Sequence, residues 1–364
     1  MLKNRPNYIL IATVFLLLLL GILILASASA PLSQMRFGNT FHFLNRQVFN
    51  LGPGLILAFL AFIIPLSFWK KFIFPLLLIN LVFLAMVFIP GIGIEIGGAK
   101  RWIDLGIITF QPAEFLKLTF IVYLAAWLAN RTEKVKSNLR FGQNLIVFLI
   151  IIGTIALFFF FQPNIGTFGI IALTAFFMYF AAATPVWHSI FMIFLGLSAF
   201  FILIKVAPYR LERLLVFLNP GTDPLGMGYH IKQSLIAIGS GGIAGLGLGM
   251  SVQKFGFLPA SLTDSIFAVF AEETGFIGVF ILIALFLIFF WQGWKIAKNS
   301  RDKFCQLTAL GISSWIIIQA FVNICSMVGL LPLTGIPLPF ISYGGSHLIA
   351  ELIGVGILLN ISKQ

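Results

Sequence analysis

Residues 265–293 read SIFAVFAEETGFIGVFILIALFLIFFWQG, an apolar run interrupted by one pair of acids, Glu272 and Glu273. A helix needs about 20 apolar residues to cross a bilayer, so this segment predicts a membrane-spanning helix. An ionised carboxylate inside a bilayer is unfavourable unless it is paired or faces a polar cavity. These acids, together with Asp264 immediately before the run, therefore indicate a functional site.

The composition of the whole chain agrees with a membrane protein. Of its 364 residues, 60% are hydrophobic and 9% are charged, whereas a soluble domain carries about 25% charged residues. No hydrophilic stretch is long enough for a separate soluble domain, so residues 1–364 form one predicted membrane domain. The net charge of +12 does not indicate nucleic-acid binding, because there is no soluble basic face to present.

Hydropathy predicts an all-α, polytopic fold with about ten transmembrane helices. The first apolar run is longer than the hydrophobic region of a signal peptide, so we expect an uncleaved span rather than a cleaved leader. The predicted spans lie near residues 8–28, 48–66, 70–90, 112–129, 143–161, 165–183, 187–206, 265–293, 306–330 and 346–361.

The distribution of Lys and Arg predicts the orientation, because cytoplasmic loops are enriched in these residues. An orientation with both termini in the cytoplasm places 13 of the 23 basic residues there. The outer face then holds a large loop, about residues 207–264, between the seventh and eighth spans. It also holds basic residues that scatter alone would explain, or that neutralise a phosphate-bearing ligand: Lys100, Arg101, Arg210, Arg213, Lys232 and Lys254, with Arg36 and Arg46.

Asp264 follows a glycine-rich stretch, residues 239–249, and the pair Leu258-Pro259. It could simply favour the dipole of the helix that it precedes, but that interpretation does not explain the glycines or the acids below it. On a continuous helix Glu272 lies about 80° from Asp264, so it could share the same cavity. Glu273 lies on the opposite face, where we expect it to pair with another helix.

Two further segments carry polar groups at membrane depth. Glu114 and Lys117 are three residues apart and can pair on one helix face, either as a structural ion pair or as part of the lining around Asp264. Residues 331–346 contain three prolines among several glycines and cannot form a regular helix. They predict a re-entrant or interfacial loop that either approaches a ligand closely, with Ser342 and Tyr343 available, or simply connects two spans.

Nothing in the sequence indicates a metal centre or a disulfide. The four histidines are scattered without ligand spacing, and Cys305 and Cys325 fall on one predicted span.

Taken together, these segments resemble the SEDS family in the order in which they occur and over nearly the whole chain. The residues that carry the resemblance are Lys100-Arg101-Trp102-Ile103, Phe110-Gln111-Pro112-Ala113-Glu114 with Lys117, Gln162-Pro163 with Ile165-Gly166-Thr167, Gln233 to Gly242 including Ser240, Leu258-Pro259, Thr263-Asp264, Ile266 to Val269, Glu272-Glu273 and the run Gly335 to Gly345. Departures from the family pattern include Asn164, where an aspartate is usual, and Ser265, where phenylalanine is usual.

The resemblance implies a peptidoglycan glycosyltransferase that polymerises lipid II at the outer face of the bacterial plasma membrane. It places the functional aspartate on Asp264 and the glutamate and lysine of the fourth span on Glu114 and Lys117. Three segments favour the division-type, FtsW-like branch over the RodA-like elongation branch: Asn219-Pro220, Asp223-Pro224 and residues 249–254. As secondary candidates for substrate binding or for lining the cavity we expect Lys100, Arg101, Arg210, Arg213, Gln233, Ser240, Lys254, Glu272, Ser342 and Tyr343.

The resemblance also implies the reaction partners. The substrates are lipid II and a glycan carried on undecaprenyl pyrophosphate, and the protein partners are a class B penicillin-binding protein and other division proteins. A divalent cation, Mg²⁺ or Mn²⁺, could assist at the pyrophosphate, although no ligand cluster indicates one. A lipid II flippase or a non-catalytic scaffold remains an alternative, because many spans with a buried ion pair would also suit transport.

Overall fold

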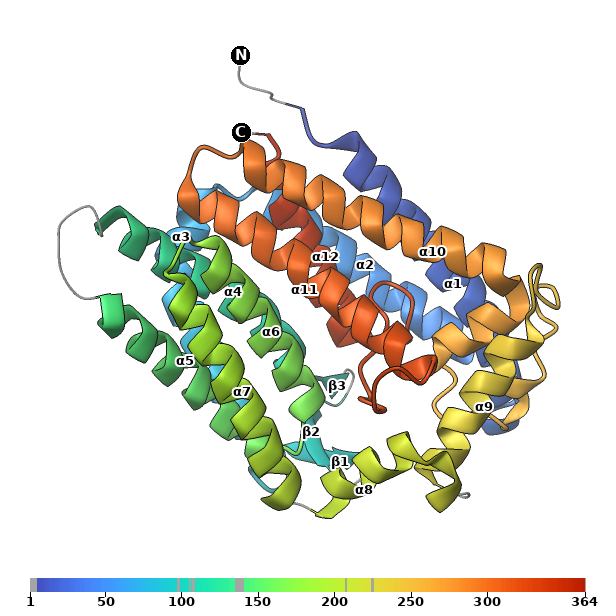
Figure 1. Ribbon diagram of the computed structural model, residues 1–364. Coiled ribbons are helices and arrows are strands. Elements are labelled where there is room, and N and C mark those ends of the chain that lie inside the picture. Colours follow the sequence, from blue (N-terminus) through green and yellow to red (C-terminus); the bar gives the residue numbers. More distant parts are fainter. Residues whose placement is uncertain are drawn as a thin grey trace.

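The computed structural model describes residues 5–96, 99–104, 106, 109–134, 141–206, 208–223 and 226–363. Helices dominate this part of the chain, and a small sheet lies at one end of the bundle (Figure 1). The helices are α1 (Tyr8–Phe37), α2 (His42–Ile63), α3 (Leu66–Met86), α4 (Pro112–Lys134), α5 (Phe141–Phe161), α6 (Ile165–Ala181), α7 (Val186–Val206), α8 (Pro208–Leu218), α9 (Met227–Ser240), α10 (Ile266–Asn299), α11 (Lys303–Met327) and α12 (Gly345–Ile361).

Each of the ten predicted spans coincides with one of these helices. Seven are long and apolar enough to cross a membrane, and α6, α7 and α12 are shorter apolar helices. The helical, multi-pass character expected from the sequence is therefore confirmed. The main difference in length is at α1, which continues to Phe37 because Ser29 and Ser33 are buried within the bundle rather than ending the helix.

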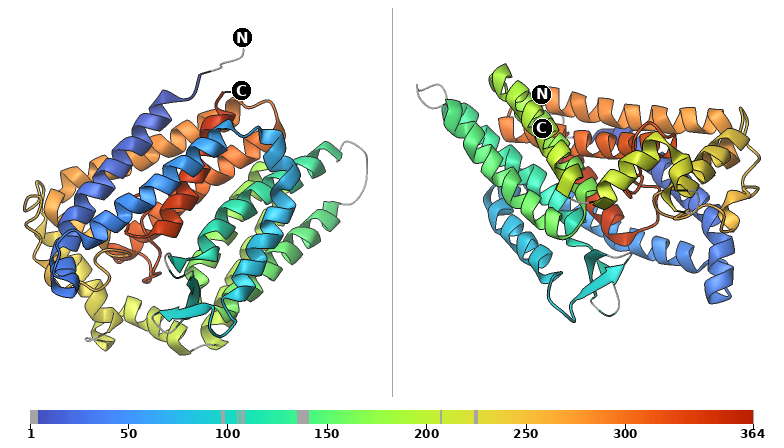
Figure 2. Two further views of the ribbon diagram at one scale, coloured as in Figure 1. Left: turned by 180° about the vertical axis from the view of Figure 1, so that it is seen from behind. Right: turned by 60° about the horizontal axis from the view of Figure 1, so that its bottom comes forward.

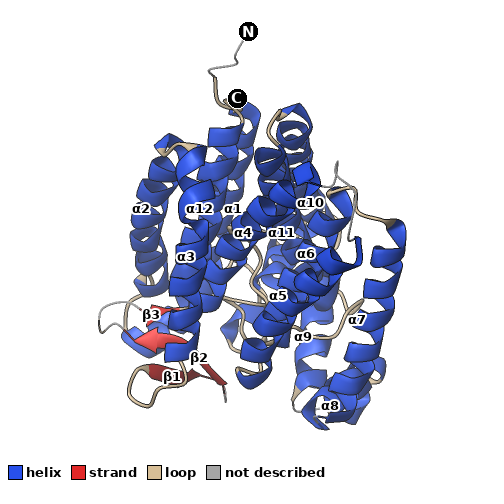
Figure 3. Ribbon diagram, turned by 90° about the vertical axis from the view of Figure 1, so that its left-hand side faces the viewer, coloured by secondary structure: helices blue, strands red, loops and turns tan. Residues whose placement is uncertain are grey.

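The large outer segment, predicted as a loop, contains regular secondary structure. Residues 207–264 contain α8 and α9, and the segment before α4 forms a three-stranded antiparallel sheet of β1 (Gly93–Ile96), β2 (Ala99–Asp104) and β3 (Thr109–Phe110). Both termini lie at the opposite end of the bundle from this sheet and from α8 (Figures 1 and 3). One end of the bundle therefore carries the sheet and α8, and the other end carries both termini.

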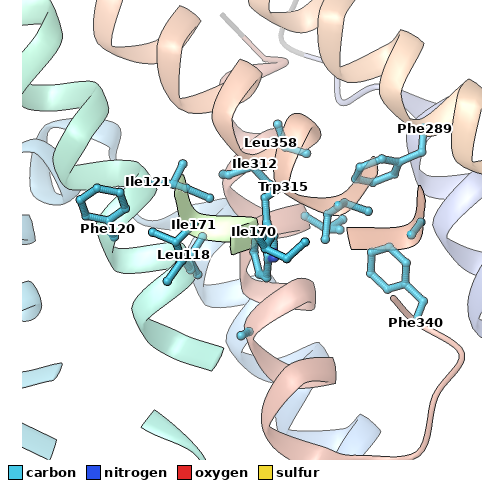
Figure 4. Close-up of a cluster of buried hydrophobic side chains, with 14 of the residues drawn as sticks. Leu118, Phe120, Ile121, Ile170, Ile171, Phe289, Ile312, Trp315, Phe340 and Leu358 are labelled. Carbon is cyan, nitrogen blue, oxygen red and sulfur yellow. The ribbon is translucent and has the colours of Figure 1, made fainter. Parts of the chain in front are cut away.

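The helix α11 forms the centre of the bundle, packed against α4, α6, α10 and α12. Its side chains are largely buried, and Trp315 lies among Ile170, Ile312 and Leu358 in the apolar core (Figure 4). Small residues permit the close approach: a Cβ added to Gly311 would lie 2.6 Å from the sulfur of Met178 on α6. Any polar group on α11 must therefore find its hydrogen-bond partners inside the protein.

The helix α10 is interrupted at Gly275, whose φ of 64° lies in the left-handed region. The glycine-rich segment after α9 fills the interruption: Leu246 N donates to Glu272 O and Phe276 N donates to Gly242 O. The backbone approach is close, since a Cβ on Gly241 would lie 2.1 Å from Ala271 O. The glycines noted in the sequence thus satisfy the backbone groups that the break leaves without partners. The same end of the bundle, with α9 beside α10, comes forward in Figure 2.

Candidate active site

Asp264 occupies a tight turn immediately before α10, outside the apolar part of that helix. Thr263 N and Ser265 N both donate to Ala260 O, at 3.0 and 3.2 Å. Ala260 adopts a φ of 50° to allow this turn. The carboxylate is consequently presented by a fixed loop at the end of the bundle that carries the sheet.

The side chain of Asp264 lines a cavity of about 470 Å³. The wall beside the carboxylate comes from the irregular segment 331–336. Gly335 has a φ of 69°, and a Cβ placed on it would lie 3.5 Å from Asp264 Oδ2, so the glycine leaves the carboxylate uncovered. The lining also includes the apolar side chains Leu173, Phe200 and Val322 of α6, α7 and α11.

Two arginines line the same cavity and make it attractive to an anion. Arg101 reaches from β2 and donates through Nη2 to Pro163 O at 2.6 Å. Arg213 reaches from α8 and donates through Nη1 to Leu333 O at 3.4 Å. Burial raises the pKa of Asp264 to about 6, and the Thr263 side chain and then the two arginines hold it below a still higher value.

The described lining favours an anion over a metal ion. Asp264 is the one acid among the described residues of the lining, to which Asn164 contributes a neutral amide. Divalent cations such as Mg²⁺ prefer several oxygen ligands, including one or two carboxylates. Within the described ranges, no group of three or more acidic, histidine or cysteine side chains could hold a metal.

The irregular segment 331–344 is tied to the Asp264 turn by its own side chains and backbone. Ser342 Oγ donates to Thr263 O at 2.6 Å and accepts from Leu338 N at 2.8 Å. Tyr343 N donates to Leu262 O at 2.9 Å. Of the residues expected from the sequence, Ser342 and Tyr343 therefore hold the turn from behind, and the backbone of the segment forms the cavity wall.

Asn323 on α11 connects the two halves of the site. Its Nδ2 donates to Asp264 O at 2.8 Å and to Ile336 O at 2.7 Å, and the residue is completely buried. One turn earlier, Gln319 Nε2 donates to Pro337 O at 3.0 Å. Sequence reasoning missed both amides because it searched the spans for charges. The available signal was two carboxamides four residues apart on an otherwise buried helix.

Glu114 and Lys117 form a buried ion pair of 2.8 Å. Lys117 Nζ also donates to Gln319 Oε1 at 2.7 Å, and Gln319 lies within 3.5 Å of Glu351 Oε1. Glu351 Oε2 in turn accepts from Phe340 N at 2.8 Å. The pair lies outside the lining of the Asp264 cavity, and its hydrogen bonds lead to the segment 331–344 through Gln319 and Glu351.

The two acids of α10 do not share the cavity with Asp264. Glu272 accepts from Ser251 Oγ and from Val252 N, and thereby closes the turn after the glycine-rich segment. Glu273 pairs with Lys254 at 2.9 Å and accepts from Ser27 Oγ of α1. The expected position of Glu272 is wrong, because the segment 241–253 folds back onto that face of the helix. Lys254 is likewise buried in its ion pair.

The remaining candidates are more distant from Asp264. Lys100 is exposed on β2, beside Arg101 but on the other face of the strand. Gln233 lines a separate hollow on α9, and the exposed Ser240 donates to Ala237 O in its own helix. Arg210 belongs to α8, and its side chain lies outside the described part of the structure.

Together these features define a multi-pass helical membrane protein with a carboxylate and two arginines in a cavity at the end remote from its termini. The chain belongs to the cell cycle protein family that includes FtsW, RodA and SpoVE, whose model matches residues 7–364. The family resemblance inferred from the sequence motifs is therefore confirmed.

Individual relatives match over nearly their whole length. Stage V sporulation protein E of Bacillus subtilis is 40% identical over 361 residues, which cover 99% of this chain and 98% of that protein. A probable peptidoglycan glycosyltransferase FtsW of Thioalkalivibrio sp. is 40% identical over 367 residues, which cover 100% of this chain and 91% of that one.

Solved structures have the same fold. A chain from a peptidoglycan synthase complex, described for its coordination of polymerization and crosslinking, matches with a TM-score of 0.76 and 28% identity, over 98% of this chain and 97% of that one. The rod shape determining protein RodA of Thermus thermophilus matches with a TM-score of 0.71 and 27% identity, over 98% and 96% of the two chains.

Asn323→Leu tests the link between α11 and the site. It leaves two buried carbonyls without a donor, each costing about 1–3 kcal/mol, and should accelerate amide hydrogen exchange in residues 331–345. Asn360→Leu is the matched control, because Asn360 Nδ2 donates to two carbonyls, Ala61 O and Ile64 O, at the other end of the bundle. Equal exchange in the two variants over residues 331–345 would contradict the assignment.

Proposed function

We propose that this protein is a peptidoglycan glycosyltransferase that polymerises lipid II, with Asp264 as the catalytic base. The observation that carries the proposal is the placement of one carboxylate with a raised pKa in the same cavity as Arg101 and Arg213. Glycosyl transfer from a pyrophosphate donor requires this combination: a base for the attacking hydroxyl, and cations for the leaving group.

In the proposed reaction, the Asp264 carboxylate takes the proton from a sugar hydroxyl of the acceptor. The hydroxyl oxygen forms a bond to the anomeric carbon of the donor glycan, and the bond from that carbon to the pyrophosphate oxygen breaks. Undecaprenyl pyrophosphate leaves with the electron pair, and its charge is stabilised by Arg101 and Arg213. Asp264 then returns the proton to solvent. A single displacement converts the α-linked donor into a β-linked product.

We propose that the site faces outward. Lys70, Lys71, Arg131, Lys295 and Lys303 all belong to helix ends on the side of the bundle that carries the termini. The positive-inside rule therefore favours a cytoplasmic position for that side, and Asp264 belongs to the opposite end. An outward site is also where a substrate anchored in the outer leaflet would be accessible.

Asp264→Asn should reduce polymerisation of labelled lipid II by the purified protein by about 10²–10⁴-fold, the usual contribution of a general base. Asp302→Asn is the matched control: Asp302 accepts from Phe304 N at the start of α11, and asparagine caps a helix equally well. Polymer formation by Asp264→Asn at the wild-type rate would reject the base assignment. Relocation of lipid II without any polymer would favour a flippase.

The reaction should depend on pH through Asp264. A base must be ionised, and burial raises the pKa of this carboxyl to about 6, so the rate should fall as the pH drops through about 6 and level off above about 7. Arg213→Gln removes a cation that lowers this pKa, and should move the midpoint to higher pH. A rate that was flat from pH 5 to 8, or a midpoint that moved to lower pH in Arg213→Gln, would count against the mechanism.

We propose that the polymerase serves cell division and works with a class B penicillin-binding protein. The matching solved chain comes from a synthase complex described for crosslinking as well as polymerization. A tagged copy at native expression level should concentrate at midcell and co-purify with such a protein. Sidewall localisation would instead assign the chain to elongation.

A further inference from the structure

A second cavity lies at the other end of the bundle, where α1 begins and α10 and α12 end. It has a volume of about 780 Å³, and its lining includes Arg5, Lys295 and Arg301. No acid belongs to the described lining, and none of the three cations forms an ion pair with a described residue. The neighbouring carboxylate of Asp302 is engaged at the start of α11, where it accepts from Phe304 N. The cavity therefore concentrates positive charge without internal compensation.

A buried amide in the lining indicates a ligand more specifically than the charges do. Gln292 is only 6% exposed, and its Oε1 accepts from Asn7 Nδ2 at 3.1 Å. No described residue accepts a hydrogen bond from its Nε2, and Gln292 contributes to the cavity wall. Gln292 therefore presents to the cavity an N–H donor that no described residue accepts, and an acceptor bound in the cavity would satisfy it.

The first turn of α1 contributes residues to the same cavity. Asn7 caps this 30-residue helix by accepting from Leu10 N at 3.0 Å. Tyr8 and Ile9, the first two residues of α1, also line the cavity. The first N–H groups of a helix have no partner within it, and together with the helix dipole they favour an anion.

We propose that this cavity binds a phosphate group, and that an anionic phospholipid of the surrounding membrane supplies it. Three cations and several N–H donors without a competing acid suit the charge-assisted acceptors of a phosphate diester. Ile9, Ile296 and Ile361 line the same cavity and provide apolar contact for the glycerol and the start of the acyl chains. A free phosphate compound would share this chemistry and lack the apolar part.

The chain provides a control against a general attraction of basic residues to an anionic membrane. Lys298 lies on the same turn of α10 as Lys295, is also exposed, and does not line the cavity. A non-specific surface effect would be indifferent to which of the two lysines is removed. A site would depend on Lys295 and not on Lys298.

The experiment uses the full-length protein in neutral detergent with dihexanoyl phosphatidylglycerol as the probe, and native mass spectrometry as the readout. Lys295→Gln and Arg301→Gln should each weaken binding about fivefold, the usual effect of one basic residue at an anionic lipid. Lys298→Gln should change it less than about twofold, and dihexanoyl phosphatidylcholine should bind more weakly than phosphatidylglycerol. The melting temperature of each variant reports whether it is folded.

An added arm separates the two sources of phosphate. Inorganic phosphate at millimolar concentration that displaces the probe from the wild-type protein, with the same dependence on Lys295 and Arg301, would support the site and assign it to a free phosphate compound. Equal weakening by Lys298→Gln and Lys295→Gln, or failure of both probes to bind, would overturn the proposal. Because the readout is binding, its failure would leave the proposed glycosyl transfer untouched.

Discussion

The site depends on the satisfaction of irregular backbone by two amides of the central helix. A segment with several prolines cannot hydrogen-bond to itself as a helix does, and at membrane depth its carbonyls need protein donors. Gln319 and Asn323 provide them, to Pro337 O, Ile336 O and Asp264 O. Since α11 is among the most buried helices of the bundle, the position of the Asp264 turn depends on a helix that the rest of the fold encloses.

The Glu114–Lys117 pair acts through the same amides. Lys117 Nζ donates a hydrogen bond to Gln319 Oε1. This contact orients the carboxamide so that its Nε2 faces the segment 331–344. Removing one partner of a buried pair costs about 3–5 kcal/mol, because the other is left unpaired. In this fold the cost would include the orientation of Gln319, so a defect at the pair would be transmitted to the Asp264 cavity without direct contact.

The sequence predicted the ten main helices correctly because long apolar runs are a local signal. It did not predict the position of Glu272, since a helical-wheel angle assumes that the helix has no neighbour, and the glycine-rich segment covers that face. The short strands between Gly93 and Phe110 were missed because runs of two to six residues carry too little alternation. Asn323 was missed because its role depends on Ile336 and Asp264, which are distant in sequence.

The distribution of the acids agrees with the proposal that the catalytic carboxylate lies outside the helices. Glu272 and Glu273 lie within α10, and both make structural contacts. Glu272 accepts from backbone N–H groups, and Glu273 pairs with Lys254 through Oε1. A carboxylate that is buried and held in this way is poorly suited to take a proton from a substrate. Asp264 is bound to α11 through its carbonyl rather than its carboxylate. The backbone of Asp264 therefore fixes the position of the turn, and its carboxylate remains available to the cavity.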